Sequence, residues 1–212
     1  MSQPDEPAWM RPNGPGWRHH SERLVYETPW ISVHHFDAEA PTGARTVYGV
    51  VRYRNLAIGI LPIFDDGSIM LVGQHRFPLR DYSWEIPEGG VHVGDDVLEG
   101  AKRELREEAG LEAREWRQVL SYQLSNSVSD ERGHGLIATG LTPTQAEIEQ
   151  DPTEAIALAR LPFREALDLA LAGRIWDVIT LAMLLRAYHM ASEGLLPEDL
   201  AMAMLAKTGG NR

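Results

Sequence analysis

The spacing of hydrophobic positions changes along the chain and predicts where strands and helices alternate. The first 20 residues are rich in Pro, Gly and polar groups, which favours a flexible arm carrying Trp9 and Trp17. Short β-rich runs separated by turn residues follow at 24–26, 30–33 and 47–51. These runs predict a small N-terminal sheet.

Two longer apolar runs come next, at 56–64 and 69–72, with Asp65-Asp66-Gly67-Ser68 between them. An Asp-Gly pair between apolar runs is the strongest short-range hairpin signal, because both residues tolerate the backbone angles of a tight turn. We therefore expect the two runs to pair as a β-hairpin.

The rest of the chain mixes strands and helices without the regular alternation that marks a parallel doubly wound sheet. We expect strands at 82–86, 117–124, 135–138 and 155–161, and helices at 96–109, 163–172 and 177–190, with a last one starting near Pro197 and ending before Gly209. The predicted class is α+β. The expected segments are an arm at 1–20, a β domain at 21–53, a main domain at 54–195, and a C-terminal helix and tail at 196–212.

Composition restricts the possible partners of this chain. The net charge of -11 disfavours a nucleic-acid surface, which needs a basic patch. An acidic protein that handles phosphates must neutralise them locally, with a divalent cation or a few Arg side chains. The absence of cysteine excludes disulfides, thiolate zinc sites and cysteine nucleophiles. No apolar run approaches the ~20 residues that span a bilayer, and the N-terminus has no signal-peptide core, so we expect a cytoplasmic protein.

The predicted helix at 96–109 has clear end signals. Asp96 followed by Glu99 resembles a capping box, and Gly110 suits a left-handed C-terminal cap. At about 100° per residue, one apolar stripe must face the core. Its members are Leu98, Ala101, Leu105 and Ala109.

Charged residues of this helix are expected to separate by sign around the stripe. The acidic flank holds Glu104, Glu107 and Glu108, and the basic flank holds Lys102, Arg103 and Arg106. Two carboxylates about 5 Å apart repel each other by on the order of 3 kcal/mol at an effective dielectric constant near 20. A hard divalent cation would relieve this repulsion. A solvated helix in which Glu99 pairs with Arg103 is the alternative that composition leaves open.

The whole segment resembles the Nudix box: Gly, five residues, an acidic residue, seven residues, Arg-Glu, an aliphatic, any residue, Glu-Glu, any residue, Gly and an aliphatic. The matching positions are Gly89, Asp95, Arg103, Glu104, Leu105, Glu107, Glu108, Gly110 and Leu111. The family usually has Glu where this chain has Asp95, which keeps the charge but shortens the reach.

This resemblance to the Nudix hydrolases implies a mixed-sheet α/β/α sandwich and a metal site. Glu104, Glu107 and Glu108 would hold Mg²⁺ or Mn²⁺, with help from the backbone carbonyl of Glu88. Arg103 would orient the glutamates through ion pairs. We expect Gly89 and Gly110 to be required by backbone conformation alone.

Flanking residues resemble those of the ADP-ribose and nucleoside-diphosphate-sugar pyrophosphatase group. The stretches are Gln74-His75-Arg76-Phe77-Pro78 and Tyr82-Ser83-Trp84-Glu85-Ile86-Pro87. In that group the residues matching Arg76 and Glu85 lie at the substrate, although a surface ion pair is the other interpretation. The N-terminal sheet fits a domain-swapped homodimer in which one subunit helps to form the other's site.

Two further regions bear on the substrate and the general base. Members specific for ADP-ribose usually carry Ser-Pro-Gly where this chain has Ser125-Asn126-Ser127, which favours ADP- or GDP-linked hexoses. With Glu107, the candidate catalytic residue is Glu154, in an acidic stretch where the group places a catalytic glutamate. Glu149 and Asp151 are its competitors, and a solvated loop is the alternative.

The resulting hypothesis is metal-dependent hydrolysis of a nucleoside diphosphate sugar to a nucleoside monophosphate and a sugar phosphate. Alternatives are an ADP-ribose-specific pyrophosphatase, a decapping or diadenosine-polyphosphate hydrolase, and a non-catalytic ligand-binding module. Zinc is disfavoured because His75, His92 and His134 form no His-x-x-x-His pair.

Overall fold

The computed structural model describes residues 7–146 and 155–206. The chain divides into two compact units. Unit 1 runs to Arg54 and includes Ser125–Asp130, and unit 2 consists of Asn55–Leu124 and the residues from Glu131 onward.

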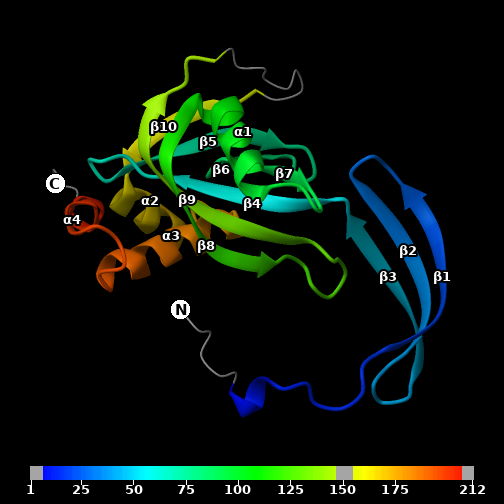
Figure 1. Ribbon diagram of the computed structural model, residues 1–212. Helices are drawn as coiled ribbons and strands as arrows, with labels where there is room; N and C mark the ends of the chain where they lie inside the picture. The colour runs from blue at the N-terminus through cyan, green and yellow to red at the C-terminus, as the bar shows by residue number, and fades with distance from the viewer. Residues whose placement is uncertain (1–6, 147–154, 207–212) are drawn as a thin grey trace. The chain divides into compact units, whose positions relative to one another are not determined.

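Unit 1 is a three-stranded antiparallel sheet in the order β1-β2-β3 (Figure 1). Its strands are β1 (Arg18–Glu27), β2 (Ile31–Glu39) and β3 (Arg45–Tyr53). The predicted runs 24–26 and 47–51 lie within strands, the run 30–33 begins one residue before β2, and β1 begins inside the predicted arm. A short 3₁₀ helix, η1 (Ala8–Met10), precedes them. Among the described residues of unit 1 only Phe36 and Ala38 are buried hydrophobic side chains. The sheet therefore has almost no core of its own.

Unit 2 contains a four-stranded sheet in the order β7-β4-β9-β8 and a three-stranded sheet in the order β10-β5-β6. Strands β4 and β9 are parallel, and every other pair is antiparallel, which confirms the predicted mixed α+β class. The strands are β4 (Asn55–Pro62), β5 (Ser68–Arg76), β6 (Asp81–Glu85), β7 (Glu88–His92), β8 (Leu111–Gln123), β9 (Arg132–Pro143) and β10 (Ala157–Pro162).

The prediction that the runs 56–64 and 69–72 pair as a β-hairpin is wrong, because the two strands lie in different sheets. A tight turn does form, with the Phe64 N–H donating to the Ser68 carbonyl and Gly67 at φ 76°. Only a bridge between Ile63 and Ile69 joins the two runs in the part of the chain described. Beyond that bridge, β4 and β5 enter different sheets, because each is an inner strand with two other partners. The turn signal sets the chain reversal but not the strand pairing.

The described part of unit 2 also contains four helices, close to their predicted positions. They are α1 (Val97–Ala109), α2 (Phe163–Leu171), α3 (Val178–Ser192) and α4 (Glu198–Leu205). No helix among the described residues has the length and apolarity needed to cross a membrane.

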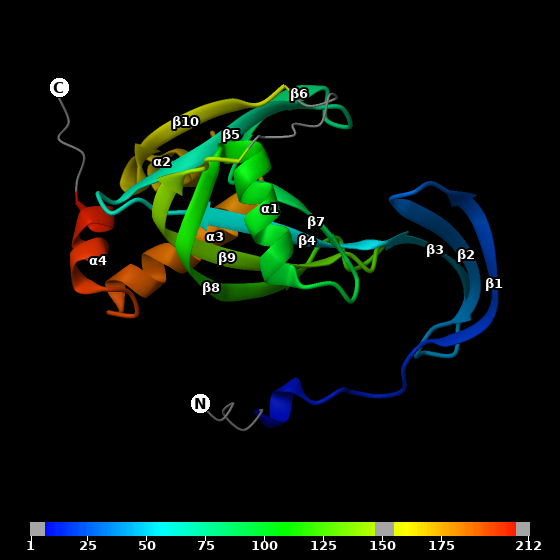
Figure 2. The same cartoon turned by 45° about the horizontal axis from the view of Figure 1, so that its top comes forward.

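Strand β4 is covered on both faces, which places α1 and α3 on opposite sides of its sheet (Figure 2). Ile58 and Ile60 pack with the apolar stripe of α1. Leu61 faces the cluster that contains α3, and a Cβ on Gly59 would meet Ile179 of α3 at 2.6 Å. This two-sided burial explains why β4 is a continuous apolar run.

The turn at Gly67 provides a test of how α4 packs on unit 2. A Cβ on Gly67 would lie 2.3 Å from the carbonyl carbon of Ala203 in α4, in addition to the strain of a positive φ. Gly67→Ala is expected to lower the free energy of unfolding by the roughly 1–2 kcal/mol of left-handed strain plus about 1–3 kcal/mol of overpacking. Urea denaturation measures both.

Gly173→Ala is the matched control, because Gly173 has φ 69° and a Cβ added there would meet no atom within 4 Å. It should show the conformational cost alone. Equal losses for the two variants would contradict the close packing of α4 on the turn.

Candidate active site

Helix α1 begins and ends where its capping residues predict. The Asp96 side chain accepts hydrogen bonds from the N–H groups of Leu98 (2.8 Å) and Glu99 (3.4 Å). Gly110 adopts the left-handed conformation with φ 63°, and its N–H donates to the Arg106 carbonyl. The Glu99 carboxylate accepts from Lys102 at 2.7 Å, and not from Arg103 as the alternative interpretation required. Capping interactions therefore fix both ends of the helix.

Two of the three box glutamates are buried beside the apolar stripe. Ala101 and Leu105 are fully buried, and Glu104 and Glu108 are only 8% and 6% exposed. Burial raises the pKa of Glu104, a change that the neighbouring Arg103 opposes and the Glu107 carboxylate reinforces. Carboxylates in this position need a cation or hydrogen-bond donors to stay charged.

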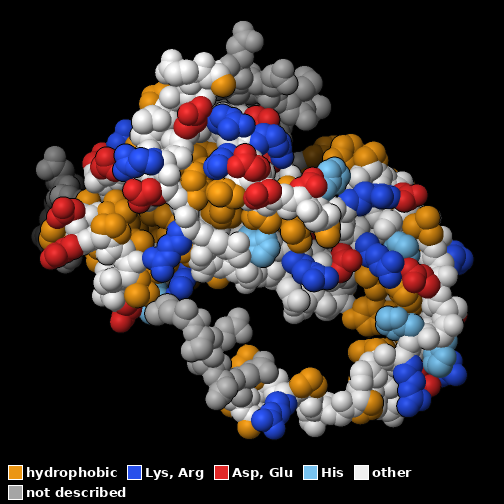
Figure 3. Space-filling model, viewed as in Figure 1, with side chains coloured by type: hydrophobic (Ala, Val, Ile, Leu, Met, Phe, Trp, Pro, Cys, Tyr) orange, Lys and Arg blue, Asp and Glu red, His pale blue; other side chains and the backbone are white. Residues whose placement is uncertain are grey.

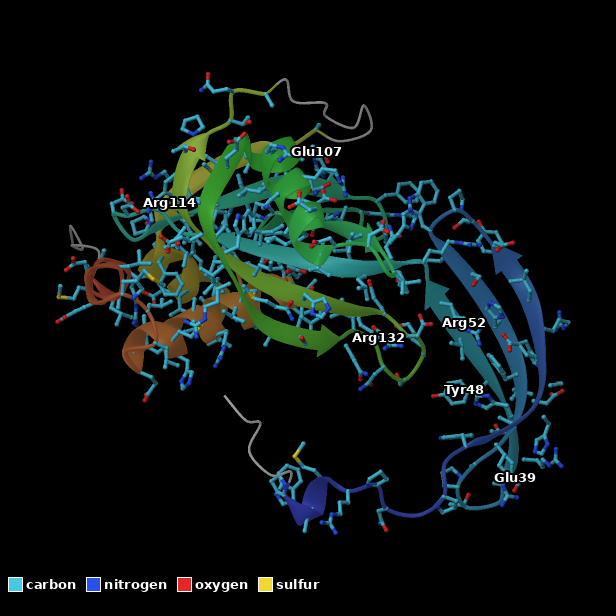
Figure 4. All side chains as sticks on the ribbon, in the orientation of Figure 1. Glu39, Tyr48, Arg52, Glu107, Arg114 and Arg132 are labelled. Carbon is cyan, nitrogen blue, oxygen red and sulfur yellow. The ribbon has the colours of Figure 1, made fainter. Side chains whose placement is uncertain are left out.

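Arg103 supplies the nearest positive charge. Its guanidinium contacts Glu104 Oε1 at 2.6 Å and Glu107 Oε2 at 2.8 Å, and it also donates to the Gly90 carbonyl at 3.1 Å. The prediction that Arg103 lies on a basic flank, apart from the glutamates, is therefore wrong. Its long side chain reaches the residue at position i+4 across the helix surface. Acidic and basic side chains alternate over this region in Figure 3, and Figure 4 labels Glu107 on α1.

Gly89 permits the close approach of β7 to α1. A Cβ at this position would lie 2.0 Å from the carboxyl carbon of Glu104, and the φ of Gly89 is not left-handed. The requirement for glycine is therefore steric, which corrects the expectation that backbone conformation alone explains it. For Gly110, whose φ is positive, that expectation holds.

The first residue of β7 ties that strand to α1. The Glu88 N–H donates to Glu108 Oε2 at 2.8 Å, which holds the buried Glu108 carboxylate against the start of the box. Burial, with the nearby carboxylates of Asp177 and Glu85, keeps the pKa of Glu88 well above its usual value. Strand β7 itself was not predicted, since Gly89 and Gly90 favour no strand and pairing with β4 creates it.

Arg76 and Glu85 form a bidentate ion pair across β5 and β6. Arg76 Nε lies 3.1 and 3.0 Å from the two carboxylate oxygens, and the guanidinium NH2 group makes a further contact. Glu85 is 3% exposed, whereas the Arg76 side chain is 34% exposed and can still reach a ligand. Burial lowers the pKa of Arg76, but the bonded Glu85 and the carboxylates of Glu88 and Glu108 raise it overall. The Arg76–Glu85 pair and the box glutamates therefore belong to one electrostatic site.

Sequence reasoning missed a residue that supports this site from α3. Thr180 is fully buried, and its hydroxyl accepts from the Ile86 N–H at 2.9 Å and contacts Glu88 Oε1 at 3.5 Å. Asp177 caps the helix by accepting from the Thr180 N–H at 2.6 Å. The spacing of Asp177 and Thr180 indicates a helix start, but nothing local indicates that the hydroxyl reaches the loop before the box.

Tyr122 of β8 also faces this region. Its buried hydroxyl has no hydrogen-bond partner among the described residues, and burial together with the charges of Glu88 and Asp177 raises its pKa. The phenol is therefore a neutral donor beside an acidic cluster.

The chemistry of the donor set fits a hard divalent cation. Carboxylates of Glu104, Glu107 and Glu108, with the Glu88 carbonyl, would provide the oxygen ligands that a hard divalent cation such as Mg²⁺ or Mn²⁺ prefers. Within residues 7–146 and 155–206, no group of three or more Asp, Glu or His side chains forms a preorganised metal-binding site. The Arg103 guanidinium bridges Glu104 and Glu107 through ion pairs.

Two predicted site residues are not found beside the glutamates: one lies in an exposed turn, and the other lies outside the residues that the structure describes. Asp95 is exposed in the turn before α1, where its N–H donates to the His92 carbonyl. Glu154 and its competitors Glu149 and Asp151 lie outside the described residues.

Thr180 offers a test of the support beneath the site. Thr180→Val should lower the free energy of unfolding by about 1–3 kcal/mol, because the Ile86 N–H loses its acceptor in a buried setting. Amide hydrogen exchange measures the effect directly, with faster exchange expected at Ile86. Thr180→Ser keeps the hydroxyl and should preserve protection at Ile86. Unchanged exchange in Thr180→Val would contradict the assigned bond.

Comparison with known proteins agrees with this geometry. The family model described as "NUDIX domain" matches residues 53–182, more than half of the chain. A Bacillus methanolicus protein named methanol dehydrogenase activator is 33% identical over 141 residues, which cover 66% of this chain and 76% of that protein. The ADP-ribose pyrophosphatase of Bacillus subtilis is 29% identical over 160 residues, covering 76% of this chain and 86% of the relative.

A solved structure shares the fold. The crystal structure of an ADP compounds hydrolase superposes with a TM-score of 0.77 at 22% identity, covering 88% of this chain and all of that one. The box, its geometry and these similarities lead to one conclusion: the chain belongs to the Nudix family of hydrolases, in its ADP-ribose pyrophosphatase group.

Proposed function

We propose that this Nudix hydrolase cuts the pyrophosphate linkage of nucleoside diphosphate sugars in a reaction that requires Mg²⁺ or Mn²⁺. The products would be a nucleoside monophosphate and a sugar phosphate. The observation that carries the proposal is the burial of Glu104 and Glu108 beside the Arg76–Glu85 pair. Carboxylates provide ligands for a cation, and the arginine provides a partner for phosphate.

When bound, the cation would activate water and offset the charge on the diphosphate, as divalent ions do in Nudix hydrolases generally. The protein's own contribution is to hold the ligands. Glu108 is positioned by the Glu88 N–H, and Glu104 is confined by Gly89 and Arg103.

ADP-linked and GDP-linked hexoses are the proposed substrates, with ADP-ribose as the alternative. The loop Ser125-Asn126-Ser127 lacks the proline usual in ADP-ribose-specific members, which supports the hexoses. The name of the Bacillus subtilis relative supports ADP-ribose. Glu154 is our proposed general base, from its sequence position next to β10, with Glu149 and Asp151 as competitors.

A homodimer is proposed for unit 1. Large hydrophobic side chains are exposed on β1, on β3 and in the turn between β1 and β2. They are Leu24, Val25, Tyr26, Trp30, Val47 and Tyr53. A patch of this kind on a sheet without its own core indicates an association surface, and a second copy is the simplest symmetric partner. Hydrophobic and histidine side chains are visible on this sheet in Figure 3.

The activity is tested by release of nucleoside monophosphate from ADP-glucose, GDP-mannose, ADP-ribose and diadenosine polyphosphates in the presence of Mg²⁺. Wild type should cleave the sugar nucleotides and lose activity with a chelator. Glu108→Gln should reduce kcat/KM by at least about 100-fold, because it weakens a metal ligand that is itself held by a hydrogen bond.

Glu99→Gln is the control, since Glu99 lies on the same helix, is exposed and pairs only with Lys102 among the described residues. It should retain activity. Failure of wild type to cleave any of these compounds, with the protein folded, would sink the proposal and favour a ligand-binding module.

The dimer is tested by light scattering after size-exclusion chromatography, which should give twice the chain mass of 23.7 kDa. Val47→Glu should weaken the dimer by roughly 100-fold or more, since a two-fold interface contains the substitution twice and each buried Val contributes about 1.5–3 kcal/mol. Leu171→Glu, at an equally exposed position of α2, should leave the mass unchanged. A monomeric wild type would contradict the proposed assembly.

A further inference from the structure

A cavity of about 510 Å³ lies next to the Arg76–Glu85 pair, between β6 and the start of α3. Its lining includes Tyr82 and Glu85 of β6, and Trp176 and Asp177 before α3. The volume is in the range of small-molecule sites. Of the residues in the preceding account of the site, only Glu85 and Asp177 are among its lining residues.

Trp176 is held as a wall of this cavity although 66% of its surface is exposed. The residue before it, Ile175, is buried in the core, and the residue after it, Asp177, caps α3. Both neighbours fix the backbone, so the indole is presented to solvent at a defined place. An exposed indole on a rigid backbone offers a large apolar face at little entropic cost.

Tyr82 forms a second aromatic part of the lining. Its ring packs edge-to-face with His75 at 4.9 Å and with Trp84 at 5.7 Å, measured between ring centroids. These contacts hold Tyr82 in position within the β5-β6 sheet. The cavity therefore has preformed aromatic parts on two separate elements.

The charged groups of the lining are acceptors. Asp81, Glu85 and Asp177 contribute carboxylates, and no Lys, Arg or His is among the lining residues that the structure describes. Each carboxylate has about four acceptor sites. Asp177 Oδ2 serves the Thr180 N–H and Asp81 Oδ1 serves the Tyr82 N–H, so acceptor capacity is left over. Such a cavity repels phosphate and suits a neutral group with several hydroxyls.

We propose that the Trp176 cavity, lined by Tyr82, Asp81, Glu85 and Asp177, binds the terminal sugar of the substrate, which is the sugar outside the nucleoside, an inference that rests on the proposed function. Glu85 connects the two parts, because it lines the cavity and also holds Arg76. A diphosphate at Arg76 would direct its sugar into the cavity. The hydroxyls would donate to the carboxylates while the apolar face of the ring stacks on Trp176.

The test compares ADP-glucose with P²-methyl ADP. The second compound keeps the nucleoside and the diphosphate but has a methyl group in place of the glucose. Trp176→Ala should raise KM for ADP-glucose about 10-fold, equal to about 1.4 kcal/mol, and leave KM for P²-methyl ADP unchanged. Trp176→Tyr should restore most of the affinity. Trp9→Ala, which removes another exposed indole, is the control and should behave like wild type.

A second measurement does not depend on turnover. Titration with glucose 1-phosphate should change the indole emission of wild type and of Trp9→Ala but not that of Trp176→Ala. An unchanged KM of Trp176→Ala for ADP-glucose would overturn the sugar site. An equal rise in KM for ADP-glucose and P²-methyl ADP would also overturn it and would indicate a nucleobase site. Lack of hydrolysis of either compound by wild type would overturn the proposed function, and the emission titration would still decide what the cavity binds.

Discussion

The site depends on one close approach, that of β7 to α1. The space between the Gly89 backbone and the Glu104 carboxylate is too small for any side chain at position 89. The Glu88 N–H holds Glu108 on the same helix face. Two acidic groups are thereby buried beside an apolar stripe, at a free-energy cost that a soluble helix would normally avoid. Glycine at the box start and carboxylates on the helix are thus parts of a single steric and electrostatic arrangement.

Positive charge around this arrangement comes from two arginines with different surroundings. Arg103 spans Glu104 and Glu107 at the partly exposed surface of α1. Arg76 is anchored on the deeply buried Glu85, which leaves part of its guanidinium accessible. Both arginines lie next to the buried carboxylates, so positive charge is concentrated at this site although the whole chain is acidic.

Support for the loop before the box comes from a distant helix. Thr180 accepts the Ile86 N–H, and its helix is capped by Asp177, which also lines the cavity beside Trp176. Helix α3 thus contributes both to the stability of the loop and to the wall of an adjacent cavity. The same helix packs under β4 on the side opposite α1, which fixes its distance from the box.

The sequence by itself determined the elements whose signals are local. Asp96 and Gly110 define the ends of α1, because capping depends on side chains a few residues away. The spacing of the box identified the family and the glutamates that face one region. Helix and strand positions also followed, because hydrophobic periodicity reflects the burial of one face.

Only the tertiary structure decided how those elements meet. The Asp-Gly turn reverses the chain, yet β4 and β5 join different sheets because strand partners far along the chain compete for the same edges. Strand β7, the contact of Thr180 with Ile86, and the steric need for glycine at position 89 have no local signal. Each depends on residues well separated along the chain, and the free energy of such contacts exists only once the chain is packed.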